Sequence, residues 1–224
     1  MSNEVGRQEL LVLGDSHSPV FNHPLFQEKF PNMHFNVVTV IGATASGLEN
    51  PNSTTQAYPI FRAALKNTAA KHIIVMLGEV DTGFVIWYRA QKYQDSVAAM
   101  LNKAITSYSR FLAEINSAFE VICISAPLPT IQDGNDWGDI ANARREVTAS
   151  QVERTALTLD FNRLMQTFCA QNDIRYLMLD SVSLGEHGIV KAELLNHNRN
   201  DHHYDQAQYS RLLAGGLAGI IGTG

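Results

Sequence analysis

The sequence has few cysteines and no long apolar run. Only two of its 224 residues are cysteines, Cys123 and Cys169, and both lie in apolar stretches. Two isolated cysteines form neither a disulfide framework nor a zinc signature, and they favour buried free thiols in a reducing compartment. No apolar stretch approaches the ~20 residues that span a bilayer. Residues 1–11 lack the basic and apolar parts of a secretory signal. These absences predict a soluble cytoplasmic protein.

Positive charge is also scarce. The 17 Lys and Arg residues are outnumbered by 22 Asp and Glu residues, and the formal net charge is −5. A nucleic-acid-binding protein needs a basic patch, and so does a protein that binds anionic membranes. Neither nucleic acid nor a membrane is therefore expected as a partner, whereas the oligomeric state stays open.

Five short apolar runs, rich in β-branched residues, are spread along the chain at 9–14, 35–42, 72–78, 120–126 and 175–180. Such nearly continuous hydrophobicity is typical of parallel strands buried on both faces. Helical patterns separate most of the runs, at 55–70, 94–117, 157–168 and 206–220. This alternation predicts an α/β fold, a three-layer α/β/α sandwich with a flavodoxin-like parallel sheet of about five strands. Residues 1–224 are expected to form one domain.

Polar or glycine-rich segments follow the predicted strands. Because ligands bind beyond the carboxyl ends of parallel strands, these segments are expected to converge. The longest irregular stretch, 126–151, is a candidate substrate wall. The segments read "GDSHS" (14–18), "GATASG" (42–47), "GEVD" (78–81), "APLP" (126–129) and "NRNDHHYD" (198–205).

Ser16 is the first candidate for chemistry among these segments. A serine on a tight turn between a strand and a helix exposes its hydroxyl, and its own N–H can face a developing oxyanion. Serine, histidine and aspartate form a catalytic set on any fold that brings them together. The histidine-rich stretch near the C-terminus supplies His202 and His203.

The same segments resemble the ordered blocks of the SGNH (GDSL-type) hydrolases. "GDSHS" resembles the first block and "IGATASGL" the second, while "LGEVD" stands in the place of Gly-x-Asn-Asp and "NDHHYDQAQY" resembles the last block. The resemblance implies the SGNH hydrolase fold and a serine esterase that needs no metal or other cofactor. It implies Ser16 as nucleophile, His203 as base, and the N–H groups of Ser16 and Gly42 as the oxyanion hole. Asp15 would support the turn. His17 is expected to be a bystander, because the metal-binding motif that it could begin lacks its other blocks.

Two departures from the family pattern concern the oxyanion hole and the acid. Val80 stands where the family has its oxyanion asparagine, and the neighbouring Glu79 and Asp81 are carboxylates. Thr82 and Arg89 are candidates to supply the missing donor.

The last block is shifted by one residue. With His203 aligned as the base, Asn200 occupies the position of the acid and Asp201 lies one residue closer. We expect Asp201 to orient the histidine. The alternatives are a dyad in which a backbone carbonyl holds His203, and a role for His202.

These residues predict a serine acyl hydrolase acting on a small acyl ester, with an O-acetylated carbohydrate as one candidate. Trp87, Tyr88 and Trp137 are candidates to stack on a sugar ring. An acyltransferase with the same site and a non-catalytic sugar- or protein-binding module remain alternatives. The least favoured alternative is a metal-dependent phosphoesterase, because Asp15 and His17 resemble the opening motif of calcineurin-like phosphoesterases but the other blocks of that family are missing.

Overall fold

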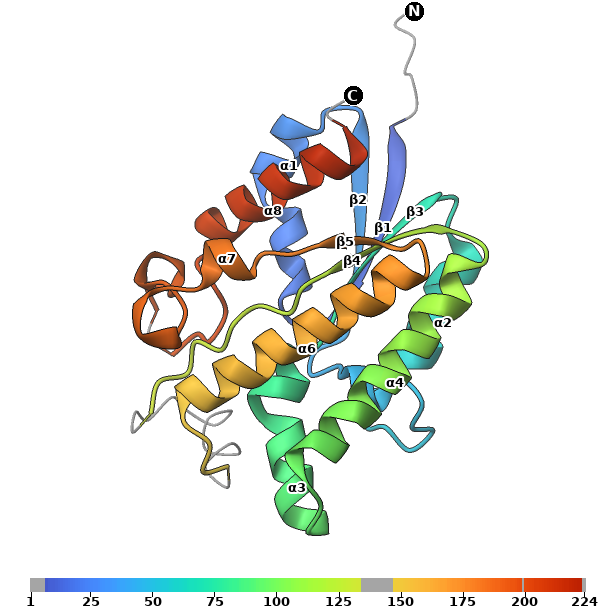
Figure 1. The fold of residues 1–224 in the computed structure, drawn as a ribbon. Helices are drawn as coiled ribbons and strands as arrows, with labels where there is room; N and C mark the ends of the chain where they lie inside the picture. Colours follow the sequence, from blue (N-terminus) through green and yellow to red (C-terminus); the bar gives the residue numbers. More distant parts are fainter. Residues whose placement is uncertain (1–6, 134–146, 199, 223–224) are drawn as a thin grey trace, which may run out of the picture.

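The computed structural model describes residues 7–133, 147–198 and 200–222. Its strands form a single parallel sheet in the order β2-β1-β3-β4-β5 (Figure 1). Strand β1 lies between β2 and β3 and has Leu10 opposite Phe35 of β2 and opposite His72 of β3. The parallel five-stranded sheet confirms the predicted fold class. The strands are β1 (Gln8–Gly14), β2 (Met33–Thr39), β3 (His72–Met76), β4 (Glu120–Ile124) and β5 (Arg175–Leu177).

Helices cover both faces of the sheet. On one face lie α1 (Pro24–Lys29) and α8 (Gln206–Ile221). The opposite face carries α2 (Ala57–Asn67), α4 (Val97–Asn116) and α6 (Gln151–Gln171) (Figure 1). Two further helices, α3 (Ile86–Tyr93) and α7 (Asp180–Ser183), follow β3 and β5. Short helical turns complete the chain at η1 (Ser18–Asn22), η2 (Ala45–Gly47), η3 (Asp81–Val85, a π-helix), η4 (Glu186–Gly188) and η5 (Ala192–Leu194).

The two-residue period of the strands divides the apolar core into two layers. On β1, Leu11 and Leu13 are buried towards α2, α4 and α6, whereas Leu10 and Val12 are buried towards α1 and α8. Successive side chains of a strand point to opposite faces, so a continuous apolar run can fill both layers. Cys123 of β4 and Cys169 of α6 are free and buried, as expected. In the described ranges, no helix has the length and apolarity needed to cross a membrane.

The element boundaries differ from the predicted ones where caps decide them. The predicted helix at 94–117 begins at Val97, because Gln94 ends α3 in a left-handed conformation (φ 51°) and the Ser96 side chain accepts the N–H of Ala99. Helices α1 and α3 were not predicted. Helix α1 has only six residues and buries only Phe26, and α3 follows a π-helical turn that shifts its apolar period.

Candidate active site

The turn after β1 holds Ser16 between two buried residues. Asp15 and His17 are buried and Ser16 is half-buried. Asp15 Oδ1 accepts the backbone N–H of His17 at 2.9 Å and lies 3.1 Å from His17 Nδ1. The Ser18 hydroxyl donates to the Asp15 carbonyl at 2.8 Å and contacts the hydroxyl of Thr39 at the end of β2. These contacts fix the turn, as expected for Asp15.

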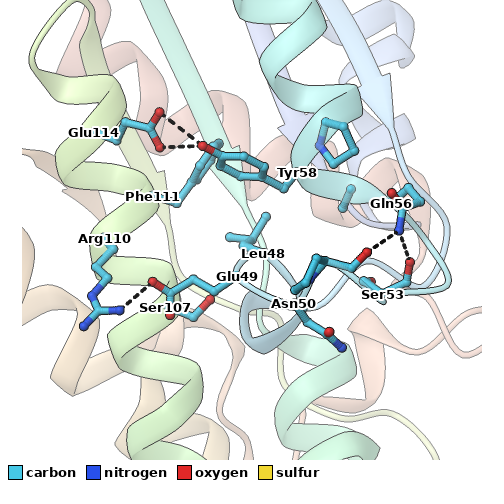
Figure 2. Close-up of a pocket in the computed structure, with 14 residues that line it drawn as sticks. Leu48, Glu49, Asn50, Ser53, Gln56, Tyr58, Ser107, Arg110, Phe111 and Glu114 are labelled. Atoms are coloured by element: carbon cyan, nitrogen blue, oxygen red, sulfur yellow. Dashed lines mark hydrogen bonds and ion pairs between the residues drawn. The ribbon is translucent and has the colours of Figure 1, made fainter.

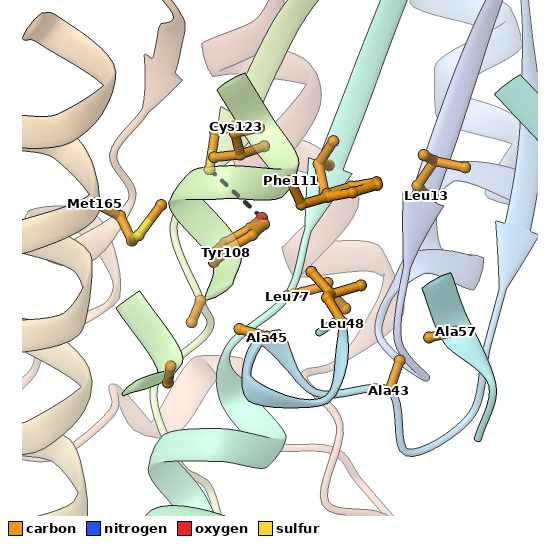
Figure 3. Close-up of a cluster of buried hydrophobic side chains, with 14 of the residues drawn as sticks. Leu13, Ala43, Ala45, Leu48, Ala57, Leu77, Tyr108, Phe111, Cys123 and Met165 are labelled. Atoms are coloured by element: carbon orange, nitrogen blue, oxygen red, sulfur yellow. Dashed lines mark hydrogen bonds between the residues drawn. The ribbon is translucent and has the colours of Figure 1, made fainter. Parts of the chain in front are cut away.

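The second segment forms a loop whose conformation requires glycine at Gly42. This residue has a φ of +71°, in the region that side chains disfavour. Beyond it, the loop packs through Ala43, Ala45 and Leu48 against the apolar core, close to Leu77 (Figure 3). Within the described residues, neither the N–H of Gly42 nor that of Ser16 donates a backbone hydrogen bond.

Asp81 anchors this loop from the third segment. Its buried carboxylate accepts the N–H of Ala45 at 2.6 Å and that of Ser46 at 3.0 Å. The Ser107 hydroxyl of α4 donates to the carbonyl of Ala45 at 2.8 Å. Burial raises the pKa of Asp81, while the bonds from Ser46 and Ala45 oppose that rise. A charged-group acceptor for two successive N–H groups is a strong restraint on the loop.

Both residues suggested as substitutes for the oxyanion asparagine have hydrogen-bond partners within the fold. The Thr82 hydroxyl donates to the carbonyl of Gly78 at 3.1 Å and accepts the hydroxyl of Thr158 at 2.8 Å. Arg89 donates to Ser46 Oγ at 2.8 Å and so braces the same loop as Asp81. Val80 itself has an apolar side chain, and the side-chain donor of the family pattern is therefore missing at this position.

The histidine-bearing loop is fixed from both sides. The buried Tyr204 accepts the N–H of Leu128 through its hydroxyl at 2.8 Å, and Thr130 donates to the carbonyl of His202. Asp205 caps α8 by accepting the N–H of Gln208 at 3.0 Å. Part of the predicted wall at 126–151 therefore holds this loop. Residues 134–146 of that stretch, with Trp137, lie outside the described residues.

Asp201 and His203 form a carboxylate–imidazole pair in this loop. Asp201 Oδ1 lies 2.6 Å from His203 Nδ1 and accepts the backbone N–H of His203 at 3.0 Å. Asn200, the competing candidate, is exposed, and its N–H donates to Asn198 Oδ1 at 3.1 Å. Burial alone would raise the pKa of Asp201, but the bonds from His203 outweigh it and lower that pKa.

The fold brings the first turn and the last loop into contact. The ring centroids of His17 and His203 are 4.6 Å apart, and those of His202 and His203 are 4.2 Å apart. Within the described ranges, the buried His203 Nε2 has no hydrogen-bond partner, and Ser16 makes no hydrogen bond to it. Such bonds often form only when substrate is bound. His17, expected to be a bystander, lies within this cluster.

Several charges act on His203. Burial is the largest cause that lowers its pKa, and the charge of His17 lowers it further. The bond to Asp201 and the charges of Asp201 and Glu79 oppose this shift. Glu79 is buried at the end of β3, so the third segment contributes a carboxylate to the surroundings of the histidine. The net effect favours a neutral imidazole, the form that can accept a proton.

One group in the described part of the chain has the donor atoms to hold a metal ion. It consists of Asp201, His202 and His203, whose ligand atoms lie within 4.8 Å of one another. Asp15 and His17, the ligands that the phosphoesterase alternative requires, do not belong to it. The geometry therefore gives that alternative no additional support.

A cavity of about 490 Å³ lies between the Gly47–Asn50 part of the second segment, the start of α2, and α4 (Figure 2). Tyr58 and Phe111 line it, and Tyr58 donates to Glu114 across its edge at 3.1 Å. None of the proposed catalytic residues lines this cavity, so it is separate from the cluster around Ser16.

Comparison with known proteins places the fold. No protein-family model and no curated protein matches the sequence. Among solved structures, a GDSL-like lipase from Bacteroides thetaiotaomicron is 14% identical over 96% of this chain and 87% of its own, with a TM-score of 0.60. The acetyl xylan esterase AlAXEase is 10% identical over 95% and 99%, with a TM-score of 0.60. An extracellular lipase from Streptomyces rimosus is 15% identical over 93% and 99%, with a TM-score of 0.54. At such low identity the likeness establishes the fold, which confirms at that level the resemblance indicated by the sequence blocks.

Proposed function

We propose that this protein is a serine ester hydrolase in which Ser16 is the nucleophile, His203 the base and Asp201 the acid that orients it. The observation that carries the proposal is the 2.6 Å pair of Asp201 and His203, whose imidazole lies against the turn that holds Ser16. The order of the sequence blocks supports the same assignment. Esterases and lipases among the structures with this fold are a further, fold-level support.

In the first half-reaction, Ser16 Oγ attacks the ester carbonyl and its proton passes to His203 Nε2. Asp201 accepts a hydrogen bond from Nδ1–H of His203 and stabilises the imidazolium. The negative oxygen of the tetrahedral intermediate accepts hydrogen bonds from the N–H groups of Ser16 and Gly42. The bond to the leaving alcohol then breaks, and His203 gives its proton to that alcohol. An acyl group remains on Ser16.

In the second half-reaction, water attacks the acyl carbon and transfers a proton to His203. The bond to Ser16 Oγ breaks, the carboxylic acid leaves, and His203 returns the proton to Ser16. When an alcohol takes the place of water, the product is a new ester and the enzyme acts as an acyltransferase. The proposed site residues need no metal or organic cofactor for either route.

Val80 is expected to limit the rate. Removal of one oxyanion donor typically costs roughly 10²- to 10³-fold in kcat, and Val80 supplies no side-chain donor. We therefore expect the protein to hydrolyse esters with good leaving groups much better than alkyl esters.

The proposed substrate is a small acyl ester, with an O-acetylated carbohydrate as the favoured class. One structure with this fold is an acetyl xylan esterase. Two of the aromatic candidates for sugar stacking lie in the described residues. Trp87 donates from Nε1 to the carbonyl of Thr82 at 2.7 Å. The ring of Tyr88 stacks on that of Phe84, with the ring centroids 5.5 Å apart. Because Trp87 is tied into the fold, Tyr88 is the better candidate to contact a sugar.

The test is hydrolysis of p-nitrophenyl acetate in the presence of EDTA by the wild type and by Ser16→Ala and His203→Ala. We expect both substitutions to abolish turnover and EDTA to have no effect. His197→Ala is the matched control, because that ring lies near the same loop and is 96% exposed. Thermal unfolding of each variant checks that the fold is retained.

Three outcomes would contradict this proposal. Full activity of Ser16→Ala would exclude the nucleophile. EDTA-sensitive hydrolysis of a phosphodiester would favour the metal-dependent alternative. A sugar that raises the Tm of a protein without esterase activity would favour a binding module. Adding an alcohol acceptor to the active enzyme separates hydrolysis from acyl transfer.

A further inference from the structure

We propose that His17 is a positioning residue for His203: held by Asp15, its ring packs against the catalytic imidazole and opposes a second positive charge there. This inference rests on the proposed function, because it assigns a task to His17 in the activation of Ser16. The family resemblance assigns no task to this position.

The two histidines are held by the same local geometry. In each case an aspartate two residues earlier uses Oδ1 to accept the backbone N–H of the histidine, at 2.9 Å for His17 and 3.0 Å for His203. The same oxygen lies near the ring Nδ1, at 3.1 Å and 2.6 Å respectively. A carboxylate at Nδ1 fixes both the tautomer and the orientation of an imidazole. Both rings are therefore fixed by a carboxylate at Nδ1.

His17 packs directly against His203. The His203 ring contacts two others: its centroid lies 4.6 Å from that of His17, with a 59° tilt, and 4.2 Å from that of His202, with a 34° tilt. The His17 side chain is 2% exposed and that of His203 is 20% exposed. The buried ring thus forms a rigid support for the ring that must meet the substrate.

The charges around His203 come from three segments. Asp15 and His17 follow β1, Glu79 follows β3, and Asp201 and His202 belong to the same loop as His203. Glu79 and Asp201 favour its protonated form, whereas burial and the charge of His17 lower its pKa. His17 thereby offsets part of the effect of the carboxylates, which would otherwise keep His203 protonated and unable to act as a base.

The test compares His17→Asn and His17→Phe in the Ser16→Ala background, with the titration of His203 followed by NMR. Asparagine keeps a donor for Asp15 but removes the ring and its charge, whereas phenylalanine keeps a ring without charge. We expect the pKa of His203 to rise in both variants. His197→Asn, at an exposed ring, is the control and should leave it unchanged.

In the active enzyme, the same substitutions should move the acid limb of the kcat/KM profile to higher pH. The result is a several-fold loss of activity at acid pH that shrinks as the pH rises. A packing role alone would lower kcat in His17→Asn at every pH without moving the limb. An unchanged or lowered pKa of His203 in both folded variants would overturn the inference.

If the His17 variants do not fold, ring ¹⁵N spectra of the Ser16→Ala protein provide the second measurement. We expect the Nδ1–H tautomer for both His17 and His203, with mutually dependent titrations. Independent titration of the two rings would overturn the inference. Because these measurements use an inactive variant, they fail or succeed separately from the esterase assay, which tests the proposed function.

Discussion

The turn at Asp15–His17 and the loop at Asp201–His203 contain the same three-residue arrangement in different surroundings. In both, an aspartate binds the backbone and the ring of the histidine two residues later. Asp15 and His17 are almost completely buried, with exposed side-chain fractions of 1% and 2%. Those of Asp201 and His203 are 37% and 20%. Only the second pair therefore combines an oriented imidazole with partial exposure to solvent.

This difference shows that local sequence sets the geometry of such a pair, while its place in the fold sets what it can do. A buried pair contributes rigidity and a charge to its neighbours. In the proposed mechanism, the partly exposed pair exchanges protons with a bound ester and with Ser16. Neutralising Asp201 should consequently affect mainly activity, and neutralising Asp15 mainly stability.

The largest expected effect separates the two aspartates. Asp201→Asn should lower kcat by roughly 10²- to 10⁴-fold, because the imidazolium loses its counter-charge and its tautomer is no longer fixed. Stability should change little, since Asp201 is partly exposed. Steady-state kinetics and urea unfolding measure the two effects. Asn200→Ala is the control and should keep at least half of the wild-type kcat, because Asn200 is exposed.

The opposite pattern is expected for Asp15→Asn. Its buried carboxylate serves both the backbone and the ring of His17, so the free energy of unfolding should fall by about 1–3 kcal/mol. The fall in kcat should be smaller than that of Asp201→Asn. Equal losses of kcat in the two variants would contradict the division of roles between the pairs.

A carboxylate without an imidazole partner extends the comparison. Asp81 binds the backbone N–H groups of Ala45 and Ser46 in the loop that carries Gly42. Asp81→Ala leaves two N–H groups without an acceptor, which costs about 1–3 kcal/mol each where they stay buried. A shift of the loop by about 1 Å can reduce kcat by up to about 10²-fold. Asp81→Asn retains one acceptor oxygen, and its kcat should lie between those of Asp81→Ala and the wild type.

The smallest effect is expected at Asp180, a carboxylate whose partner is an amide. Asn162 donates to it at 2.7 Å, and burial raises its pKa to about 6. The folded protein then binds a proton that the unfolded chain has already released, so stability should fall as pH rises from about 4 to 6. Asp180→Asn should remove this decline and raise the free energy of unfolding at pH 7 by about 1 kcal/mol, after allowance for solvent screening. Urea titrations at pH 4 and pH 7 measure both quantities. A steeper decline in the variant would contradict the assignment.

The sequence by itself determined the sheet and the local chemistry. Apolar runs that fill both core layers specify parallel strands, and their polar ends had to converge at one edge of the sheet. Each aspartate binds a histidine two residues later in the chain, so these two pairs depend on local sequence spacing. Capping residues moved the start of α4 from the predicted position, and α3, which follows a π-helical turn, was not predicted. Single residues decide such features.

The tertiary structure alone decided which side chains meet. It placed His17 against His203, used Thr82 and Arg89 inside the fold, and left His203 Nε2 buried without a partner among the described residues. The contact between His17 and His203 joins segments nearly 190 positions apart in the chain. Its geometry depends on how strands and helices pack, which no local pattern encodes. Packing therefore placed His17 against His203, although its position in the sequence had marked it only as a neighbour of Ser16.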